Sequence, residues 1–178
     1  MAKVNASITI STPVENVFAY IDETANGMEF IPSITDIRGI AGHGVGKRWG
    51  WTYKMMGLPL KGEAKVIEHI PNQRYVINTT GGITSTWTWT FKDNTGETKL
   101  QLEVEYTIPV PILGKMAERL VMRRNQREAE FAMANLKEGL EWRSKFKSLR
   151  NGDFSSMKWN DLKSAPIGLD SNKSNGYE

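Results

Sequence analysis

Between Ser33 and Ile108 the chain reads as six strands joined by short turns, and this pattern limits the possible folds more than any other part of its 178 residues. Apolar and polar residues alternate along the strands. Glycine, proline or asparagine marks every break, at residues 42–44, 56–59, 71–72, 80–82 and 93–96. Strands joined by such short turns pair as antiparallel neighbours. The segment therefore predicts an antiparallel meander.

The inner face of this meander can be checked, because paired residues in an antiparallel sheet point to the same face. Closing the hairpins at residues 93–96 and at Gly57 predicts these pairs: Trp89 with Leu100, Trp87 with Leu102, Ser85 with Val104, Ile83 with Tyr106, Tyr53 with Gly62, Trp51 with Ala64 and Trp49 with Val66. A two-residue turn at Pro71-Asn72 brings Tyr75 and Ile77 to the same face. One face is thus mainly apolar and aromatic, and the other is mainly polar.

One strand and two short helices are predicted before the meander. Residues 3–10 alternate as a strand. A helix start follows, with Thr12 as the cap, Pro13 in the first helical position and Glu15 completing a capping box. A second short helix covers residues 23–30.

One long helix is predicted after the sheet, from Leu113 to about Lys147, because apolar residues recur there at helical spacing. The residues that follow are polar, rich in serine, asparagine and glycine, and without periodicity. We expect a single domain over residues 1–147 and a mobile tail over residues 148–178.

The width of the predicted sheet indicates an internal cavity. Seven strands about 4.8 Å apart span roughly 30 Å, whereas one helix with its side chains is only about 10–12 Å across. The sheet must therefore curl around the long helix, while the two short helices close one end. An α+β fold of this kind leaves a partly unfilled apolar space, the type of cleft that binds small molecules.

Residues of the inner face and of the long helix are expected to line this space. The predicted ligand-binding residues are Trp49, Trp51, Tyr53, Tyr75, Trp87, Trp89, Leu102, Tyr106, Val121 and Asn125. Each buried tryptophan or tyrosine needs a polar partner, which favours a cavity; the alternative is that these rings simply fill the core. Asn125 interrupts the apolar stripe of the helix, so either its amide meets a partner inside or a slight rotation turns it to solvent.

Few residues offer catalytic or metal-binding chemistry. There is no cysteine, and the two histidines, His43 and His69, stand without a second ligand nearby in sequence. We therefore expect surface or capping roles for both, and neither a metal nor a cofactor. The glycine-rich segment 42–46 lacks the spacing of a phosphate-binding loop. No catalytic residue is assigned among the polar residues predicted to face inward from the strands and the long helix, which are Glu68, Tyr53, Tyr75, Tyr106, Arg124 and Asn125.

Charge and hydropathy indicate a cytoplasmic protein. No apolar run approaches the roughly 20 residues of a membrane-spanning helix, and the first residues lack the apolar core of a signal peptide. Ten basic and five acidic residues lie between Lys115 and Arg150. We interpret this surplus as the solvated face of the helix, with contact to an anionic membrane surface as the alternative. The sequence carries no nucleic-acid-binding motif.

Several segments, taken in order, resemble the START-like SRPBCC superfamily, in particular its polyketide cyclase/dehydrase and lipid-transport branch. They are residues 8–18, Gly44-Val-Gly-Lys-Arg-Trp, Trp87-Thr-Trp-Thr-Phe followed by Gly96-Glu-Thr-Lys-Leu, and Asn135-Leu-Lys-Glu-Gly-Leu-Glu. The resemblance extends over about residues 3–142. It implies a helix-grip fold with a deep hydrophobic cavity for lipids, sterols, polyketides, quinones or other aromatic compounds, and it implies no single reaction.

Three functions stay open from the sequence. The scarcity of inward carboxylates favours the first, a non-catalytic binder or carrier of a small hydrophobic molecule. The second is a cyclase, dehydratase or isomerase for an aromatic or polyketide-like substrate, which needs an acid or base in the cavity. The third is a protein-interaction module of the chaperone-activator kind. A buried carboxylate or tyrosine pair touching the ligand would favour the second, and a pocket collapsed by its own tryptophans, with a docked tail, would favour the third.

Overall fold

The computed structural model describes residues 2–55, 57–107 and 115–150, without the side chains of residues 115–122 and 147–150. The described residues fall into two compact units, and the first, which ends at Ser144, contains the sheet. The elements in chain order are β1 (Ala2–Ile10), α1 (Val14–Asp22), the 3₁₀ helix η1 (Thr24–Asn26), α2 (Gly27–Phe30), β2 (Ile34–Ala41), β3 (Arg48–Met55), β4 (Leu58–Ile70), β5 (Arg74–Gly81), β6 (Thr84–Asn94), β7 (Glu97–Thr107) and α3 (Lys115–Arg150).

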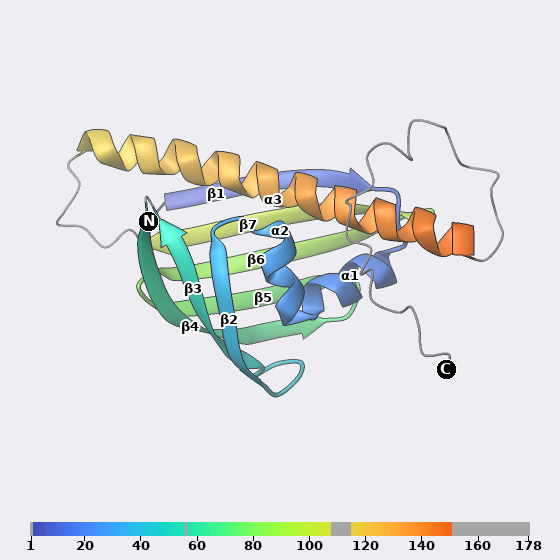
Figure 1. Cartoon of the computed structure of the whole chain (residues 1–178), viewed down its shortest axis with the longest axis horizontal. Coiled ribbons are helices and arrows are strands. Elements are labelled where there is room, and N and C mark those ends of the chain that lie inside the picture. Colours follow the sequence, from blue (N-terminus) through green and yellow to red (C-terminus); the bar gives the residue numbers. More distant parts are fainter. Residues whose placement is uncertain (1, 56, 108–114, 151–178) are drawn as a thin grey trace, which may run out of the picture. The chain divides into compact units, whose positions relative to one another are not determined.

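The seven strands form one antiparallel sheet in the order β1-β7-β6-β5-β4-β3-β2. Strands β2 to β7 are the predicted meander, and β1 pairs with β7 at the far edge. The sheet curves around α3, and α1 and α2 lie at one end of it (Figure 1). This arrangement confirms the predicted helix-grip fold. None of the described helices is long and apolar enough to cross a membrane.

Helix α1 packs by the apolar stripe that its sequence predicts, since Val14, Val17, Phe18 and Ile21 are all buried. The predicted capping box at its start is wrong. Pro13 is the N-cap and no side chain caps the helix. The buried carbonyl of Thr12 instead accepts a hydrogen bond from Thr98 Oγ1 at 2.7 Å, so Thr12 is tied to the start of β7 rather than to the helix.

Two hairpins are tighter than predicted. Both have two-residue turns, which place Asn94 opposite Glu97 and Met55 opposite Leu58. The register therefore moves by two residues, and the observed inner pairs are Trp89 with Leu102, Trp87 with Val104, Ser85 with Tyr106, Tyr53 with Leu60, Trp51 with Gly62 and Trp49 with Ala64. A shift of two leaves each side chain on its predicted face, because faces alternate with a period of two.

A β-bulge in β4 corrects the prediction for Glu68. The register shifts between Val66 and Glu68, so the chain gains one residue there and the alternation reverses beyond it. Ile70 then lies opposite Arg74, so the turn that follows has three residues, and the predicted two-residue turn at Pro71-Asn72 is wrong. Glu68 then lies opposite Val76 and forms an ion pair with Arg74 at 2.9 Å, away from the interior. His69 takes the inward position that alternation alone assigns to Glu68.

Small and large residues share the inward face of α3. Ala129, Ala132, Met133, Leu136 and Leu140 are buried in the core. The helix is also fastened to β1 and its end, where Lys137 Nζ donates to the Thr9 carbonyl at 2.6 Å and the Ser11 N–H donates to Glu141 at 2.8 Å. These contacts hold the alanine-bearing turns at a fixed position over the sheet.

Candidate functional site

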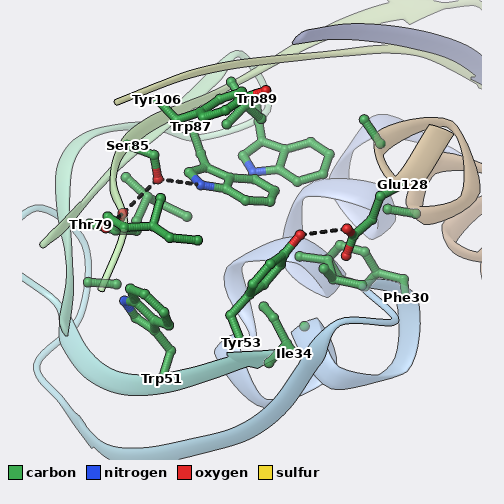
Figure 2. A pocket seen from close by; sticks show the side chains of 18 of the residues that line it. Phe30, Ile34, Trp51, Tyr53, Thr79, Ser85, Trp87, Trp89, Tyr106 and Glu128 are labelled. Atoms are coloured by element: carbon green, nitrogen blue, oxygen red, sulfur yellow. Dashed lines mark hydrogen bonds between the residues drawn. The ribbon is translucent and has the colours of Figure 1, made fainter. Parts of the chain in front are cut away.

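A cavity of about 150 Å³ lies between the sheet, the short helices and α3. Eight of the ten residues predicted to bind a ligand line it: Trp49, Trp51, Tyr53, Tyr75, Trp87, Trp89, Tyr106 and Asn125. Ile21, Phe30, Ile31 and Ile34 form the wall near the short helices, and Ala129 and Ala132 face it from α3. Figure 2 shows aromatic rings from opposite walls facing the same space.

Two predicted residues are not among the lining. Leu102 is fully buried opposite Trp89, but it packs in the core beside the cavity. The side chain of Val121 lies outside the described part of the chain. Contact between a ligand and the eight lining residues stays a prediction.

The position of the Trp51 ring depends on Gly62, the residue opposite it. A Cβ atom at Gly62 would lie 2.3 Å from Cζ2 of the Trp51 indole and 2.1 Å from the carbonyl oxygen of Thr80. Both distances are far below van der Waals contact, so only glycine fits between this ring and strand β5. The pairing of Trp51 with Gly62 lets the indole lie against the strand and form one wall of the cavity.

A chain of hydrogen bonds fixes the wall formed by β5 and β6. Trp87 Nε1 donates to Ser85 Oγ at 3.0 Å, and Thr79 Oγ1 donates to the carbonyl of Ile83 at 3.1 Å. The two hydroxyl oxygens lie 2.6 Å apart. Since the only hydroxyl hydrogen of Thr79 points to Ile83, Ser85 must donate to Thr79. Every hydrogen in this chain is therefore used within the protein.

The other polar group of the cavity is a tyrosine–carboxylate pair. The hydroxyl of Tyr53 donates to Glu128 Oε2 at 2.5 Å (Figure 2). Burial raises the pKa of Tyr53 well above its ordinary value, and the negative charge of Glu128 raises it further. Tyr53 consequently stays protonated and donates. The second carboxylate oxygen, Oε1, is buried and has no hydrogen-bond partner among the described residues.

Glu128 is the charged residue of the described lining, and the sequence prediction missed it. It faces the cavity beside Asn125, one helical turn along α3. Its position four residues before the buried Ala132 is the only hint in the sequence, because residues four apart lie near the same helix face. Arg124 belongs to the predicted inward set but is exposed, so that prediction is wrong.

A second polar cluster lies where α1 ends. His69 Nε2 is 3.1 Å from Asp22 Oδ2, and Lys47 Nζ is 3.5 Å from Asp22 Oδ1. Lys47 also donates to the carbonyl of Asp22, at the C-terminus of the helix, where a cation is favourable. The ring of His69 packs edge-on against Phe18 and Tyr75, so His69 is a half-buried interior residue and the prediction of a surface or capping role is wrong.

Tyr75 connects this cluster with the cavity. The residue is buried to 1% exposure. Burial raises the pKa of Tyr75, and the charge of nearby Asp22 raises it further. A neutral phenol thus separates the charged cluster from the cavity. Across the described residues, no three histidine or acidic side chains are grouped to hold a metal ion.

The geometry defines what this site can do. The cavity presents indole, phenol and aliphatic surface on nearly all sides, and such a lining favours an apolar, planar guest. The one charged group among its lining residues is Glu128. A carboxylate in such surroundings can accept a hydrogen bond or a proton.

Structural comparisons agree on the fold. The Thermus thermophilus protein TTHA0849 superimposes with a TM-score of 0.70 at 21% identity, over 78% of this chain and 96% of that one. The Zhui aromatase/cyclase from Streptomyces sp. R1128 gives a TM-score of 0.69 at 12% identity, over 80% and 94% of the two chains. At these identities the likeness concerns the fold.

A sequence model of the family described as polyketide cyclase/dehydrase and lipid transport matches residues 1–141. A search among curated proteins finds no match. The family match covers both the sheet and the part of α3 that lines the cavity. The chain therefore belongs to the polyketide cyclase/dehydrase and lipid-transport family of the START-like SRPBCC superfamily.

Proposed function

We propose that this protein binds a small aromatic molecule in the cavity between α3 and the sheet. The observation that carries the proposal is the cavity itself, whose walls include four tryptophans and three tyrosines. Apolar cavities near 150 Å³ accept a guest such as benzene. The volume thus favours a compact guest of one or two rings over a long acyl chain.

The family supports a ligand-binding or cyclase-like role in general terms. The Zhui structure is that of an aromatase/cyclase, and its fold likeness is consistent with an aromatic guest here. Carrying or storing the guest without chemistry is the simplest function that this lining supports, because most of its surface offers only packing.

The binding proposal is tested with an apolar fluorescent dye and three variants. Trp87→Ala and Trp51→Ala remove aromatic surface from opposite walls and should weaken dye binding several-fold. Thr86→Ala is the matched control, because Thr86 is bonded to Asn78 on the outer face. Equal effects from all three substitutions would contradict the proposal. Native mass spectrometry of the purified protein should in addition detect a bound small molecule, which solvent extraction would identify.

The Tyr53–Glu128 pair favours a second candidate function, a cyclase or dehydratase. A buried carboxylate with one free oxygen is placed to remove a proton from a bound substrate and to return that proton at another atom. Turnover of the extracted molecule by the wild-type protein, lost in Glu128→Gln while binding persists, would support catalysis. Binding without turnover would favour the carrier.

The remaining predictions have narrower support. The cavity is not filled by its tryptophans, which removes one of the two conditions set for a protein-interaction module, and the tail of the other condition lies outside the described residues. A cytoplasmic location, and contact of the basic stretch 115–150 with an anionic membrane, stay predictions.

A further inference from the structure

The cavity has an unequal supply of donors and acceptors. On the β5–β6 side, all polar hydrogens of Trp87, Ser85 and Thr79 are donated within the protein. They go to the Ser85 and Thr79 hydroxyl oxygens and to a backbone carbonyl. On the α3 side, Glu128 receives the hydroxyl of Tyr53 on one oxygen only. The charged acceptor left over is Oε1 of Glu128, which is buried and unpartnered among the described residues.

An unfilled carboxylate oxygen in an apolar cavity is costly. A buried charged acceptor without a hydrogen bond has lost its hydration and gained no partner. The free-energy cost is larger than that of the neutral indole N–H of Trp51, which also has no partner among the described residues. A water molecule is a poor remedy, because it brings two hydrogens and needs several polar partners. On this side of the cavity Phe30 and Ile34 offer none (Figure 2), and Asn125 is the one other polar residue of α3 in the described lining. The oxygen is better served by a group that brings one hydrogen on an apolar body.

We propose that the guest of this cavity is a hydroxylated aromatic ring, whose hydroxyl group donates to Oε1 of Glu128. This inference rests on the proposed function and narrows it to a ligand class. The ring lies against the indoles of Trp87 and Trp89, and the hydroxyl points to α3, where Tyr53 holds the carboxylate in place. Figure 2 shows the Tyr53–Glu128 bond beside these two indoles.

The same count of hydrogens argues against an organic ammonium ion. An ammonium group carries three N–H donors, and the described cavity offers one unfilled carboxylate oxygen. Two of those donors would lie against apolar surface. A phenol-type hydroxyl has a single hydrogen to place, and a bond from it to a carboxylate is short and strong.

The test compares two probes of nearly equal shape, 2-naphthol and 2-methylnaphthalene, by isothermal titration calorimetry. The wild-type protein is measured beside Tyr53→Phe, which keeps the carboxylate, and the double variant Tyr53→Phe/Glu128→Leu, which removes both polar groups. Glu130→Gln, on the exposed face of α3, is the control. Comparing variants for each probe cancels the different solubilities of the two probes.

We expect 2-naphthol to lose roughly 10-fold or more in affinity in the double variant, as for a lost hydrogen bond to a charged group. Its affinity should persist in the control. Tyr53→Phe, which keeps the carboxylate but loses the bond that holds it in place, should lose less affinity than the double variant, and 2-methylnaphthalene should bind the double variant at least as well as the wild type. Equal losses for both probes in the double variant would overturn the hydroxyl contact while leaving aromatic binding intact. Failure of both probes to bind the wild type would overturn the proposed function, and this inference with it.

Discussion

Glu128 and Ser85 decide how the polar atoms of the cavity are used, and they differ in how well a sequence reveals them. Strand residues such as Ser85 and Trp87 could be assigned to the interior, because strand faces alternate with a fixed period of two. The direction in which Glu128 points depends on the rotation of α3 about its own axis. The exposed Arg124 and the buried Ala129 point in directions that differ from that of Glu128 by only part of a turn around this axis. Only the packed helix settles that rotation.

At this scale, Ser85→Ala should lower the free energy of unfolding by about 1–2 kcal/mol, because the substitution leaves the Trp87 indole N–H without its acceptor. Urea denaturation measures the change. Thr86→Ala, next in sequence but on the outer face, should stay within about 0.5 kcal/mol of the wild type. A harmless Ser85→Ala would show that the indole N–H does not depend on this bond.

At the scale of elements, the strands were predictable and their register was not. The alternation of residues assigns the two faces of a strand, and a register shift of two residues leaves these faces unchanged. The residues of these two hairpins that were predicted to face inward therefore do so, although both hairpins have shorter turns than predicted. The turn around Thr95 works because that residue adopts φ = 52°, a left-handed conformation that residues other than glycine rarely take. The bulge in β4 left no comparable signal, so the exchange of Glu68 for His69 on the inner face could not be foreseen.

Two glycine substitutions separate a structural glycine from a permissive one. Gly62→Ala should destabilise the protein by about 1–3 kcal/mol, because its Cβ would overlap the Trp51 ring and the backbone of β5. Gly139→Ala, within α3, meets no atom within 4 Å and should stabilise the protein by about 0.5–1 kcal/mol through helix propensity. Thermal and urea unfolding compare the two, and a neutral Gly62→Ala would refute the close packing of Trp51 on β4.

At the scale of the whole molecule, the architecture was predictable because it follows from size: seven strands are wider than one helix. The described core residues lie between Ala2 and Leu140. A domain over residues 1–147 is compatible with that distribution, and its boundary stays a prediction. The cavity follows from the same mismatch, but its volume depends on particular side chains and could not be derived from the pattern.

Stability at alkaline pH is a property of the whole molecule that depends on buried phenols. The pKa values of Tyr53 and Tyr75 lie above the ordinary value of 10.0, and burial together with Glu29 raises the pKa of Tyr20 to about 12. Below pH 10 these groups are protonated in both states. Above it the unfolded chain releases protons that the folded chain retains, so the free energy of unfolding falls as pH rises.

Tyr53→Phe isolates one of these contributions. The difference in unfolding free energy between the wild type and this variant should shrink as pH rises from about 8 past the unfolded-state pKa, because only the wild type carries the Tyr53 proton linkage. Urea titrations across that range measure it. A difference that stays constant with pH would mean that Tyr53 titrates alike in the folded and unfolded chains.

The two alanines on α3 that face the cavity allow the size of the guest to change by substitution. Ala129 and Ala132 line the cavity from the side of α3, and their methyl side chains make no hydrogen bonds. Enlarging them to valine or leucine would shorten the admissible guest while the sheet stays as it is. Substitutions at these two positions could thus change the volume of the cavity while its aromatic walls stay the same.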